Sequence, residues 1–323
     1  MSDLPTQVRI TEEGPREGFQ IEKGPIATAR KIELIDALSR TGLPHIQTVS
    51  FVNPKRVPGM ADAEAVVAGL TMRPGVTYTG LWLNEAGLER AIATGRLEIR
   101  GTISLYGSER FLEGKQNRSP AEHLPNQHVM IENYKRRGIP FAGGVISAAF
   151  GCNFEGDVAV SRIVTLVRQM VDMAAEHGVP RITVSLADTM GWATPLKIKQ
   201  AIGAVRQKFP DLELALHLHD TRGMGIANAY AGLEMGIARF DASVAGLGGC
   251  PFAGHADAAG NVCTEDLVFL CEEMGIETGI DLDALIDCAR LAESVVGHPL
   301  PGSVMRGGSL RKLREKLSAG ASA

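Results

Sequence analysis

The sequence lacks a strong excess of either charge. Its 323 residues include 33 Lys and Arg against 37 Asp and Glu, which gives a formal net charge of −4. Without a basic excess the chain has little with which to neutralise nucleic-acid phosphates. We therefore expect no nucleic-acid partner.

The sequence also lacks a long apolar run. No stretch approaches the ~20 apolar residues that cross a bilayer. The first residues, from Met1 to Pro5, show neither the charged region nor the apolar region of a signal peptide. We expect a cytoplasmic protein that makes no membrane contact.

A disulfide framework is absent as well. The five cysteines are an odd number, widely spaced, and none forms a C-x-x-C pair. Cys271 and Cys288 lie in helix-like segments and are expected to pack as small apolar side chains. Cys250 differs from them, because it ends the stretch 246–250, a loop too rich in glycine to pack as core.

What the sequence does have is a regular alternation of strands and helices. Hydrophobic residues make up 45% and charged residues 22% of the chain, values typical of a globular protein with a sizeable core. Eight strand-then-helix units follow one another, the pattern of a (β/α)8 TIM barrel in the α/β class. A doubly wound sheet also alternates, but no G-x-G-x-x-G follows the first strand. The strands are expected at 8–10, 45–51, 76–83, 97–105, 139–147, 181–186, 212–219 and 239–245.

The C-terminal part departs from this alternation. Two helices are expected after the eighth strand, at 264–274 and 282–295, and prolines at 299 and 301 then interrupt the chain. A basic helix is expected over 309–317, followed from Ser318 by a disordered tail rich in alanine, serine and glycine. We therefore expect one TIM-barrel domain with extra C-terminal helices over residues 1–300, and a basic helix with a disordered tail over 301–323.

The seventh strand carries the most distinctive pair of residues. Side chains alternate along a strand, so His217 and His219 project from one face, where two imidazoles can chelate a divalent ion. The alternative is a pair of histidines hydrogen-bonded inside a core. The strand runs into Asp220 and a glycine-rich turn, where a strand-end site would open. This context favours a metal site.

Further polar residues follow the other strands, and in a TIM barrel the catalytic residues lie at these carboxyl ends. The positions are Arg16, Glu17, Gln47, Asn53, Lys55, Asp188, His217, His219, Asp220, Cys250 and Asn261. Glu17, the two histidines and Asn261 form a mixed nitrogen and oxygen set that suits Mg²⁺ or Mn²⁺. Taken singly, Glu17 is also compatible with a surface carboxylate, Asn261 with a helix cap and Arg16 with a surface salt bridge.

Five motifs occur in the order and spacing of one known family. They are Gly14-Pro15-Arg16-Glu17-Gly18-Phe19-Gln20, Ser50-Phe51-Val52-Asn53-Pro54-Lys55, Asp188-Thr189-Met190-Gly191, His217-Leu218-His219-Asp220 and Ala245-Gly246-Leu247-Gly248-Gly249-Cys250-Pro251. Over residues 8–296 the chain resembles the 3-hydroxy-3-methylglutaryl-CoA (HMG-CoA) lyases, a family of barrel metallolyases. The resemblance implies divalent-metal-dependent retro-Claisen cleavage of an acyl-CoA to acetyl-CoA and a keto acid, as in leucine catabolism. It also implies a homo-oligomer, either a dimer or a tetramer.

The resemblance further implies roles for individual residues. The metal ligands would be Glu17, His217, His219 and Asn261. Arg16 would polarise the thioester carbonyl, and Cys250 would protonate the product enolate. The proton of the substrate hydroxyl would go to Glu17, His217 or Asp188. Substrate contacts would come from Gln20, Gln47 and Asn53.

Three departures from the family pattern keep alternatives open. Arg16-Glu17-Gly18 stands where the family usually has Arg-Asp-Gly, Gln47-Thr48 where it has Glu-Thr, and Gly143-Gly144-Val145 where it has Arg-Gly-Tyr. One extra methylene moves a carboxylate by about 1 Å. The chain is thus also compatible with a lyase for another 3-hydroxyacyl-CoA, such as a citramalyl-CoA-like ester, or with a Claisen-type synthase. A third alternative is a barrel that binds metal and CoA esters without turnover.

Overall fold

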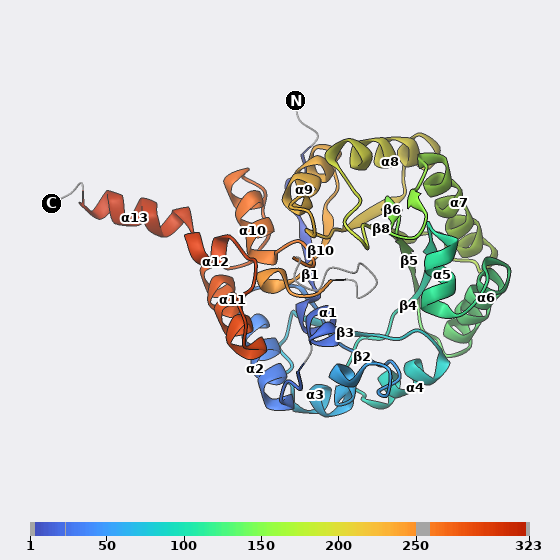
Figure 1. The fold of residues 1–323 in the computed structure, drawn as a ribbon, viewed down its shortest axis with the longest axis horizontal. Helices are drawn as coiled ribbons and strands as arrows, with labels where there is room; N and C mark the ends of the chain where they lie inside the picture. Colours follow the sequence, from blue (N-terminus) through green and yellow to red (C-terminus); the bar gives the residue numbers. More distant parts are fainter. Residues whose placement is uncertain (1–3, 23, 250–258, 321–323) are drawn as a thin grey trace.

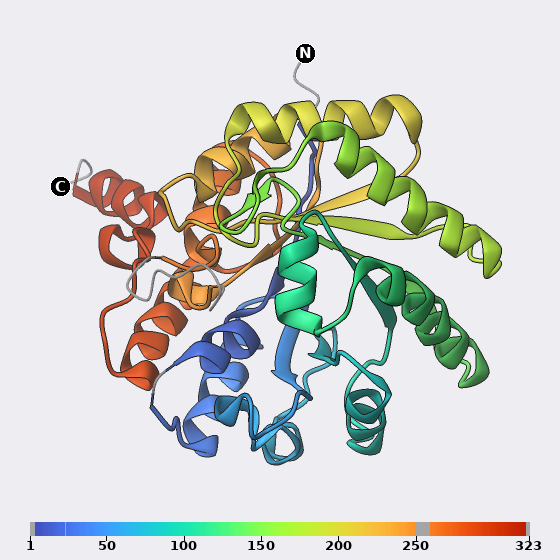
Figure 2. The same ribbon diagram turned by 45° about the vertical axis from the view of Figure 1, so that its right-hand side comes forward.

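Eight parallel strands curl around a common axis, with helices outside them (Figures 1 and 2). A computed structural model describes residues 4–22, 24–249 and 259–320. The strand order is β3-β2-β1-β10-β9-β8-β5-β4. The bounds are β1 Arg9–Glu12, β2 His45–Ser50, β3 Thr77–Leu81, β4 Gly101–Tyr106, β5 Phe141–Ser147, β8 Thr183–Ala187, β9 Glu213–His217 and β10 Arg239–Ala242. The predicted TIM barrel is confirmed.

The two ends of this strand order approach each other. The backbone N–H of Glu98, just before β4, donates to the carbonyl oxygen of Tyr78 in β3 at 2.8 Å. A short antiparallel pair, β6 Gly151–Cys152 and β7 Gly156–Asp157, lies outside the barrel sheet.

The helices that cover the barrel begin where the sequence supplies caps. The side chain of Asn84 accepts from Gly87 N–H at the start of α4, and that of Thr194 accepts from Lys197 N–H before the Pro195 that opens α8. The covering helices are α2 Thr28–Leu38, α3 Ala63–Gly69, α4 Glu85–Ala93, α6 Pro120–Arg136, α7 Val160–Glu176, α8 Pro195–Lys208, α9 Gly225–Glu234, α10 Thr264–Glu273 and α11 Leu282–Val296. Their apolar faces pack on the outside of the strands in one continuous core.

Two helices have no counterpart in the predicted pattern. Helix α1, Gly14–Ile21, follows β1 directly, with Pro15 in its first turn. Helix α5, Glu109–Gln116, begins after Ser108, whose hydroxyl accepts from Phe111 N–H. Of the two, α1 bears on function, because it carries the side chains of Arg16 and Glu17 at the carboxyl end of the barrel.

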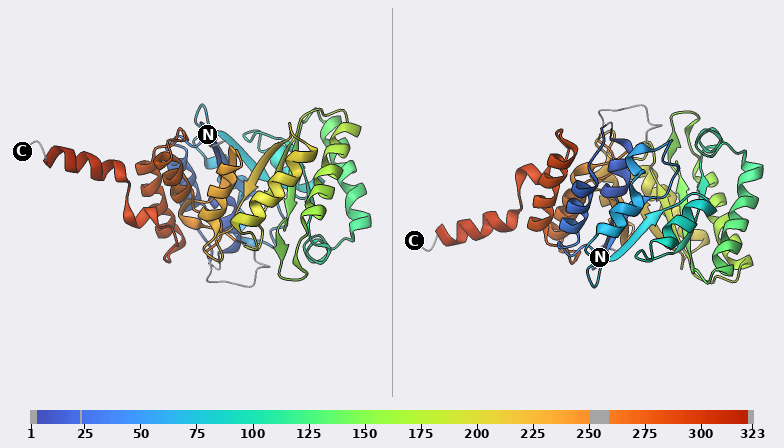
Figure 3. Two further views of the ribbon diagram at one scale, coloured as in Figure 1. Left: turned by 90° about the horizontal axis from the view of Figure 1, so that it is seen from above. Right: turned by 90° about the horizontal axis from the view of Figure 1, so that it is seen from below.

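The C-terminal helices are α12 Val304–Gly307 and α13 Leu310–Gly320. Helix α13 projects away from the barrel (Figure 3) and is tied to it by ion pairs, including Arg314 with Glu273. The disordered tail expected from Ser318 is wrong for 318–320, because the helix continues there and the Ser318 hydroxyl donates to Arg314 O at 2.8 Å. The division of the chain at residue 300 stays a prediction. Among the described residues, no helix has the length and apolarity to span a membrane.

Candidate active site

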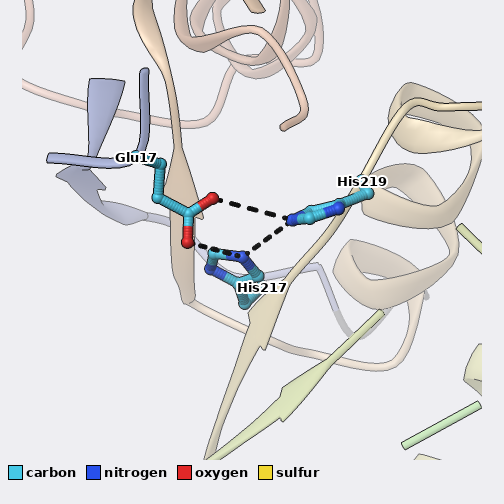
Figure 4. A group of neighbouring side chains, drawn as sticks. All are labelled: Glu17, His217 and His219. Atoms are coloured by element: carbon cyan, nitrogen blue, oxygen red, sulfur yellow. Dashed lines mark hydrogen bonds and ion pairs between the residues drawn. The ribbon is translucent and has the colours of Figure 1, made fainter. Parts of the chain in front are cut away.

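Three side chains from two distant parts of the chain meet at the carboxyl end of the barrel (Figure 4). His217 ends β9, His219 follows two residues later, and Glu17 comes from the first turn of α1. The Nε2 atoms of the two histidines are 3.1 Å apart. Each lies 3.8 Å from one oxygen of the Glu17 carboxylate. These three residues could together hold a metal ion.

Asn261 completes this group from the segment that precedes α10. Its Nδ2 donates to Glu17 Oε2 at 2.7 Å and to Leu247 O at 3.1 Å. Its Oδ1 is buried and has no hydrogen-bond partner among the described residues. A buried oxygen without a partner costs roughly 1–3 kcal/mol. A divalent ion with nitrogen and oxygen ligands would satisfy it, so the residues present fit such an ion.

Arg16 lies beside this group and is surrounded by acceptors. Its guanidinium donates from Nη1 to Glu17 Oε1, from Nη2 to Glu13 Oε2 and from Nε to Gln47 Oε1. Burial alone would raise the pKa of Glu17, but Arg16, His217 and His219 together hold it well below its ordinary value. Glu17 is therefore an ionised carboxylate at neutral pH.

The pKa values of the two histidines are shifted in opposite directions. Burial alone would lower the pKa of His217, but Glu17, Asp241 and Glu13 raise it to about 9. A metal ion at His217 would therefore have to displace a ring proton. Burial and the neighbouring His217 lower the pKa of His219 to about 4. His219 is therefore neutral at physiological pH, the form that can donate a lone pair to a metal.

Asp188 follows β8, next to the end of β9. Its Oδ1 accepts from the N–H groups of Trp192 at 2.7 Å and Ala193 at 2.9 Å, whereas Oδ2 is buried with no hydrogen-bond partner among the described residues. Burial raises the pKa of Asp188 to about 6. A carboxyl with one oxygen fixed, the other unpartnered and a pKa near neutrality is suited to proton transfer.

The remaining predicted positions are distributed differently. Gln47 joins the group through Arg16. Gln20 lies near the end of α1, and its buried Oε1 has no hydrogen-bond partner in the described part of the chain. Asn53 is exposed and accepts from Lys55 N–H at 2.9 Å, so it caps its own turn and lies outside the cluster. The prediction for Cys250 falls outside the described residues.

Three acidic residues near the site were missed by the sequence interpretation. Glu13 and Asp241 flank His217: their carboxylate oxygens lie 3.4 Å and 3.3 Å from its Nδ1. Glu12 points away from the site, where it accepts from Gly14 and Val244 N–H groups and from the Thr264 hydroxyl. A charged residue between Phe240 and Ala242 on a buried strand was the available signal for Asp241.

Glu12 also explains why α1 lies where it does. Its Oε1 receives the N–H of Gly14, at the start of α1, and that of Val244, after β10, at 2.7 Å and 2.9 Å. A Cβ at Gly14 would lie 2.6 Å from this oxygen, so a larger residue would displace the carboxyl from these hydrogen bonds. The buried carboxyl thus fixes the first turn of α1 against the segment that leads to Asn261.

Together, the fold and these side chains define a barrel enzyme with a candidate metal centre at the carboxyl ends of its strands. Comparison with known proteins narrows this class. Residues 7–292 match the model of the HMGL-like family. The chain belongs to this family, and the resemblance seen in the sequence motifs is confirmed.

Individual relatives cover most of both chains. A Pseudomonas aeruginosa protein described as a 3-hydroxy-3-isohexenylglutaryl-CoA/hydroxymethylglutaryl-CoA lyase is 41% identical over 91% of this chain and 95% of its own. The mitochondrial hydroxymethylglutaryl-CoA lyase of Gallus gallus is 40% identical over 88% of this chain and 92% of its own. The structure of an HMG-CoA lyase from Acinetobacter baumannii, in complex with coenzyme A and 3-methylmalate, has a TM-score of 0.83 at 36% identity, covering 94% of this chain and 96% of that one.

Proposed function

We propose that this chain is a carbon–carbon lyase that cleaves a 3-hydroxy-3-methylglutaryl-CoA-like thioester to acetyl-CoA and a keto acid. The observation that carries the proposal is the juxtaposition of Arg16 with the group formed by Glu17, His217 and His219 at the barrel end. The A. baumannii relative, solved with coenzyme A, supports an acyl-CoA substrate here.

The proposed cofactor is Mg²⁺ or Mn²⁺, held by Glu17, His217, His219 and Asn261. The unpartnered Oδ1 of Asn261 and the converging imidazole nitrogens support this ligand set. When bound, such an ion supplies Lewis-acid activation of the substrate hydroxyl and orients the substrate.

Separate residues of the chain are proposed to remove the substrate proton, to stabilise the enolate and to protonate it. Asp188 takes the hydroxyl proton at its unpartnered oxygen. It is preferred to the two alternative bases, because Glu17 already pairs with Arg16 and His217 already pairs with Asp241. The bond between the carbinol carbon and the carbon α to the thioester breaks, which leaves a keto group and an enolate. Arg16 stabilises the enolate oxygen. Cys250, which follows β10 in the sequence, is the proposed proton donor to the enolate carbon.

The rest of the proposal concerns recognition and assembly. Gln47 and Gln20 are proposed to contact the acyl group. Gln47 accepts a hydrogen bond from Arg16, and Gln20 lies one turn beyond Arg16 on helix α1. We further propose a cytoplasmic homo-oligomer, either a dimer or a tetramer.

A second candidate substrate is favoured by Gly143 in β5. Its φ is +128°, and a Cβ there would lie 2.0 Å from the carbonyl oxygen of Thr183. The backbone therefore admits only glycine at the position where the family pattern has arginine. This departure from the family pattern supports, as a second candidate, a 3-hydroxyacyl-CoA with another 3-substituent, such as a citramalyl-CoA-like ester.

A substrate panel tests both candidates. Purified protein would be incubated with 3-hydroxy-3-methylglutaryl-CoA, citramalyl-CoA and related esters, with Mg²⁺ or Mn²⁺, and acetyl-CoA release would be measured. EDTA-treated protein is the control for metal dependence. Release from one ester supports the proposal and identifies the acyl group. No release from any ester, by protein that binds Mn²⁺, would overturn it in favour of a non-catalytic barrel.

A further inference from the structure

Glu13 is a buried carboxylate between two groups of the site. It directly follows β1 and precedes α1, and its side chain is 7% exposed. Its Oε2 accepts from Arg16 Nη2 and lies 3.4 Å from His217 Nδ1. One oxygen therefore faces both the guanidinium beside the candidate metal centre and the outer nitrogen of a candidate ligand.

The contacts of Arg16 show what Glu13 contributes to it. Of the three acceptors around the guanidinium, Gln47 is neutral and Glu17 is shared with Asn261 and both histidines. If Glu17 held a metal ion, Glu13 would be the carboxylate left to Arg16. A bidentate or forked set of contacts fixes the plane of a guanidinium, which a single contact does not.

The contacts of His217 show a second contribution. Its Nδ1 faces Glu13 and Asp241, whereas its Nε2 faces His219 and Glu17. Carboxylates at the outer nitrogen of a ligating imidazole fix its tautomer and its ring orientation. The backbone holds Glu13 in place for this, because its N–H donates to Ala242 O at 2.8 Å, next to Asp241.

We propose that Glu13 is a positioning residue that fixes Arg16 and His217 at the same time. It acts through these two side chains and does not touch the reacting atoms. The part that concerns Arg16 rests on the proposed lyase function; the part that concerns His217 rests only on metal binding.

The first test is Glu13→Gln, which keeps the size of the side chain and removes its charge. Loss of a carboxylate behind a metal ligand typically weakens metal affinity or activity 10–100-fold. We expect Mn²⁺ affinity, measured on the metal-free protein by calorimetry, to fall about 10-fold or more. At saturating Mn²⁺ we expect kcat to fall about 10–100-fold with KM changed less than about threefold, because Arg16 acts on charge that develops in the transition state.

A relocated carboxylate separates the two contributions. Gln47 Oε1 already accepts from Arg16 Nε, so Gln47→Glu places a charge beside the same guanidinium. Because Gln47 is itself a proposed substrate contact, the double variant Glu13→Gln/Gln47→Glu is compared with Gln47→Glu alone. Between these two proteins kcat at saturating Mn²⁺ should differ by less than about threefold, since a carboxylate at position 47 still holds Arg16. Mn²⁺ affinity should stay low, since Gln47 makes no hydrogen bond to His217 in the described part of the chain. If Glu13→Gln acted only by a general loss of structure, a second substitution on β2 would not restore turnover.

Glu265→Gln is the matched control. Glu265, at the start of α10, is likewise a buried carboxylate, and its Oε2 accepts from Ala245 N–H at 3.0 Å with no hydrogen bond to Arg16 or His217. The Mn²⁺ affinity and kcat of this variant should stay within about twofold of the wild-type values. Wild-type Mn²⁺ affinity and kcat in folded Glu13→Gln would overturn the proposal, and a kcat in the double variant more than about threefold below that of Gln47→Glu would overturn the role toward Arg16.

Two further outcomes are covered by additional comparisons. If Glu13→Gln alone does not fold, the double variant is compared with Gln47→Glu, and equal Mn²⁺ affinity in these two proteins overturns the role toward His217. If the wild-type protein cleaves no ester, the proposed function fails, whereas the Mn²⁺ titrations still decide whether Glu13 positions His217.

Discussion

His217 on β9 and Asp241 on β10 are register partners, and their side chains meet: His217 Nδ1 lies 3.3 Å from Asp241 Oδ2. The contact turns the other ring nitrogen toward His219 and Glu17. Because the two residues are neighbours across a parallel ladder, the barrel backbone itself sets this distance. The orientation of His217 is thus fixed by the sheet before any metal binds.

Asp241→Asn should therefore weaken Mn²⁺ binding by about 10-fold while the fold is kept, because an amide cannot hold the imidazole tautomer as a carboxylate does. Calorimetric titration of the metal-free variant measures the effect. Glu213→Gln is the control, since Glu213 is a half-exposed carboxylate on β9 that bonds to Arg239 at 2.7 Å. Equal affinities in the two variants would show that Asp241 plays no part in metal binding.

His219→Ala removes a side chain that is 2% exposed and faces Glu17 and His217. We expect turnover to fall below detection and Mn²⁺ affinity to drop by at least about 100-fold, because a direct ligand is lost. The thermal unfolding midpoint of the metal-free variant is measured alongside, because the loss of a buried imidazole also leaves a cavity, and this effect must be separated from the loss of the ligand. His298→Ala, at a histidine that pairs with Glu22 near the surface, is the control. Full Mn²⁺ affinity in His219→Ala would exclude the chelate.

The sequence predicted the barrel and the grouping of Glu17, His217 and His219 for the same reason. Strand alternation and the position of active sites at strand ends depend on local spacing, which a sequence displays directly. Helix α1 was missed because Gly14-Pro15 is also typical of a turn, although proline in the first helical turn is a start signal.

The contacts of Glu13 and Asp241 could not be predicted in that way. They depend on which side chains approach one another across β1, β9 and β10, and β1 is far from the other two strands in the chain. Periodicity states which face a residue occupies but not its partner on the next strand. For Asn53 the structure adds a local contact that the sequence did not show, since its side chain accepts from Lys55 N–H, and its contact with substrate stays a prediction.

Gly143→Ala should destabilise the protein by more than about 3 kcal/mol, because the new Cβ combines a positive φ with a collision against Thr183 O. Urea unfolding measures the loss. Gly95→Ala separates the two causes: its φ is +62°, but no atom lies within 4 Å of the added Cβ, so a loss of about 1 kcal/mol is expected. Similar losses in the two variants would show that β5 can accommodate a side chain at 143.

Glu12 should make the protein less stable as the pH rises. Burial raises the pKa of this carboxyl to about 8, in spite of its hydrogen bonds to Thr264, Val244 and Gly14. In the unfolded chain a glutamate releases its proton near pH 4.3. Between these two values the folded state binds more protons than the unfolded state, so the free energy of unfolding decreases as the pH rises.

Glu12→Gln tests this directly, because an amide reproduces the protonated carboxyl: it accepts the two backbone N–H groups and donates to the Thr264 hydroxyl. Relative to the wild type, the variant should gain stability from pH 5 to pH 8, by about 3–4 kcal/mol over the interval. Denaturant unfolding at pH 5, 6, 7 and 8 measures the difference, with Glu33→Gln, at an exposed glutamate on α2, as the control. If the wild type and Glu12→Gln keep a constant difference across these pH values, Glu12 is already ionised in the folded protein.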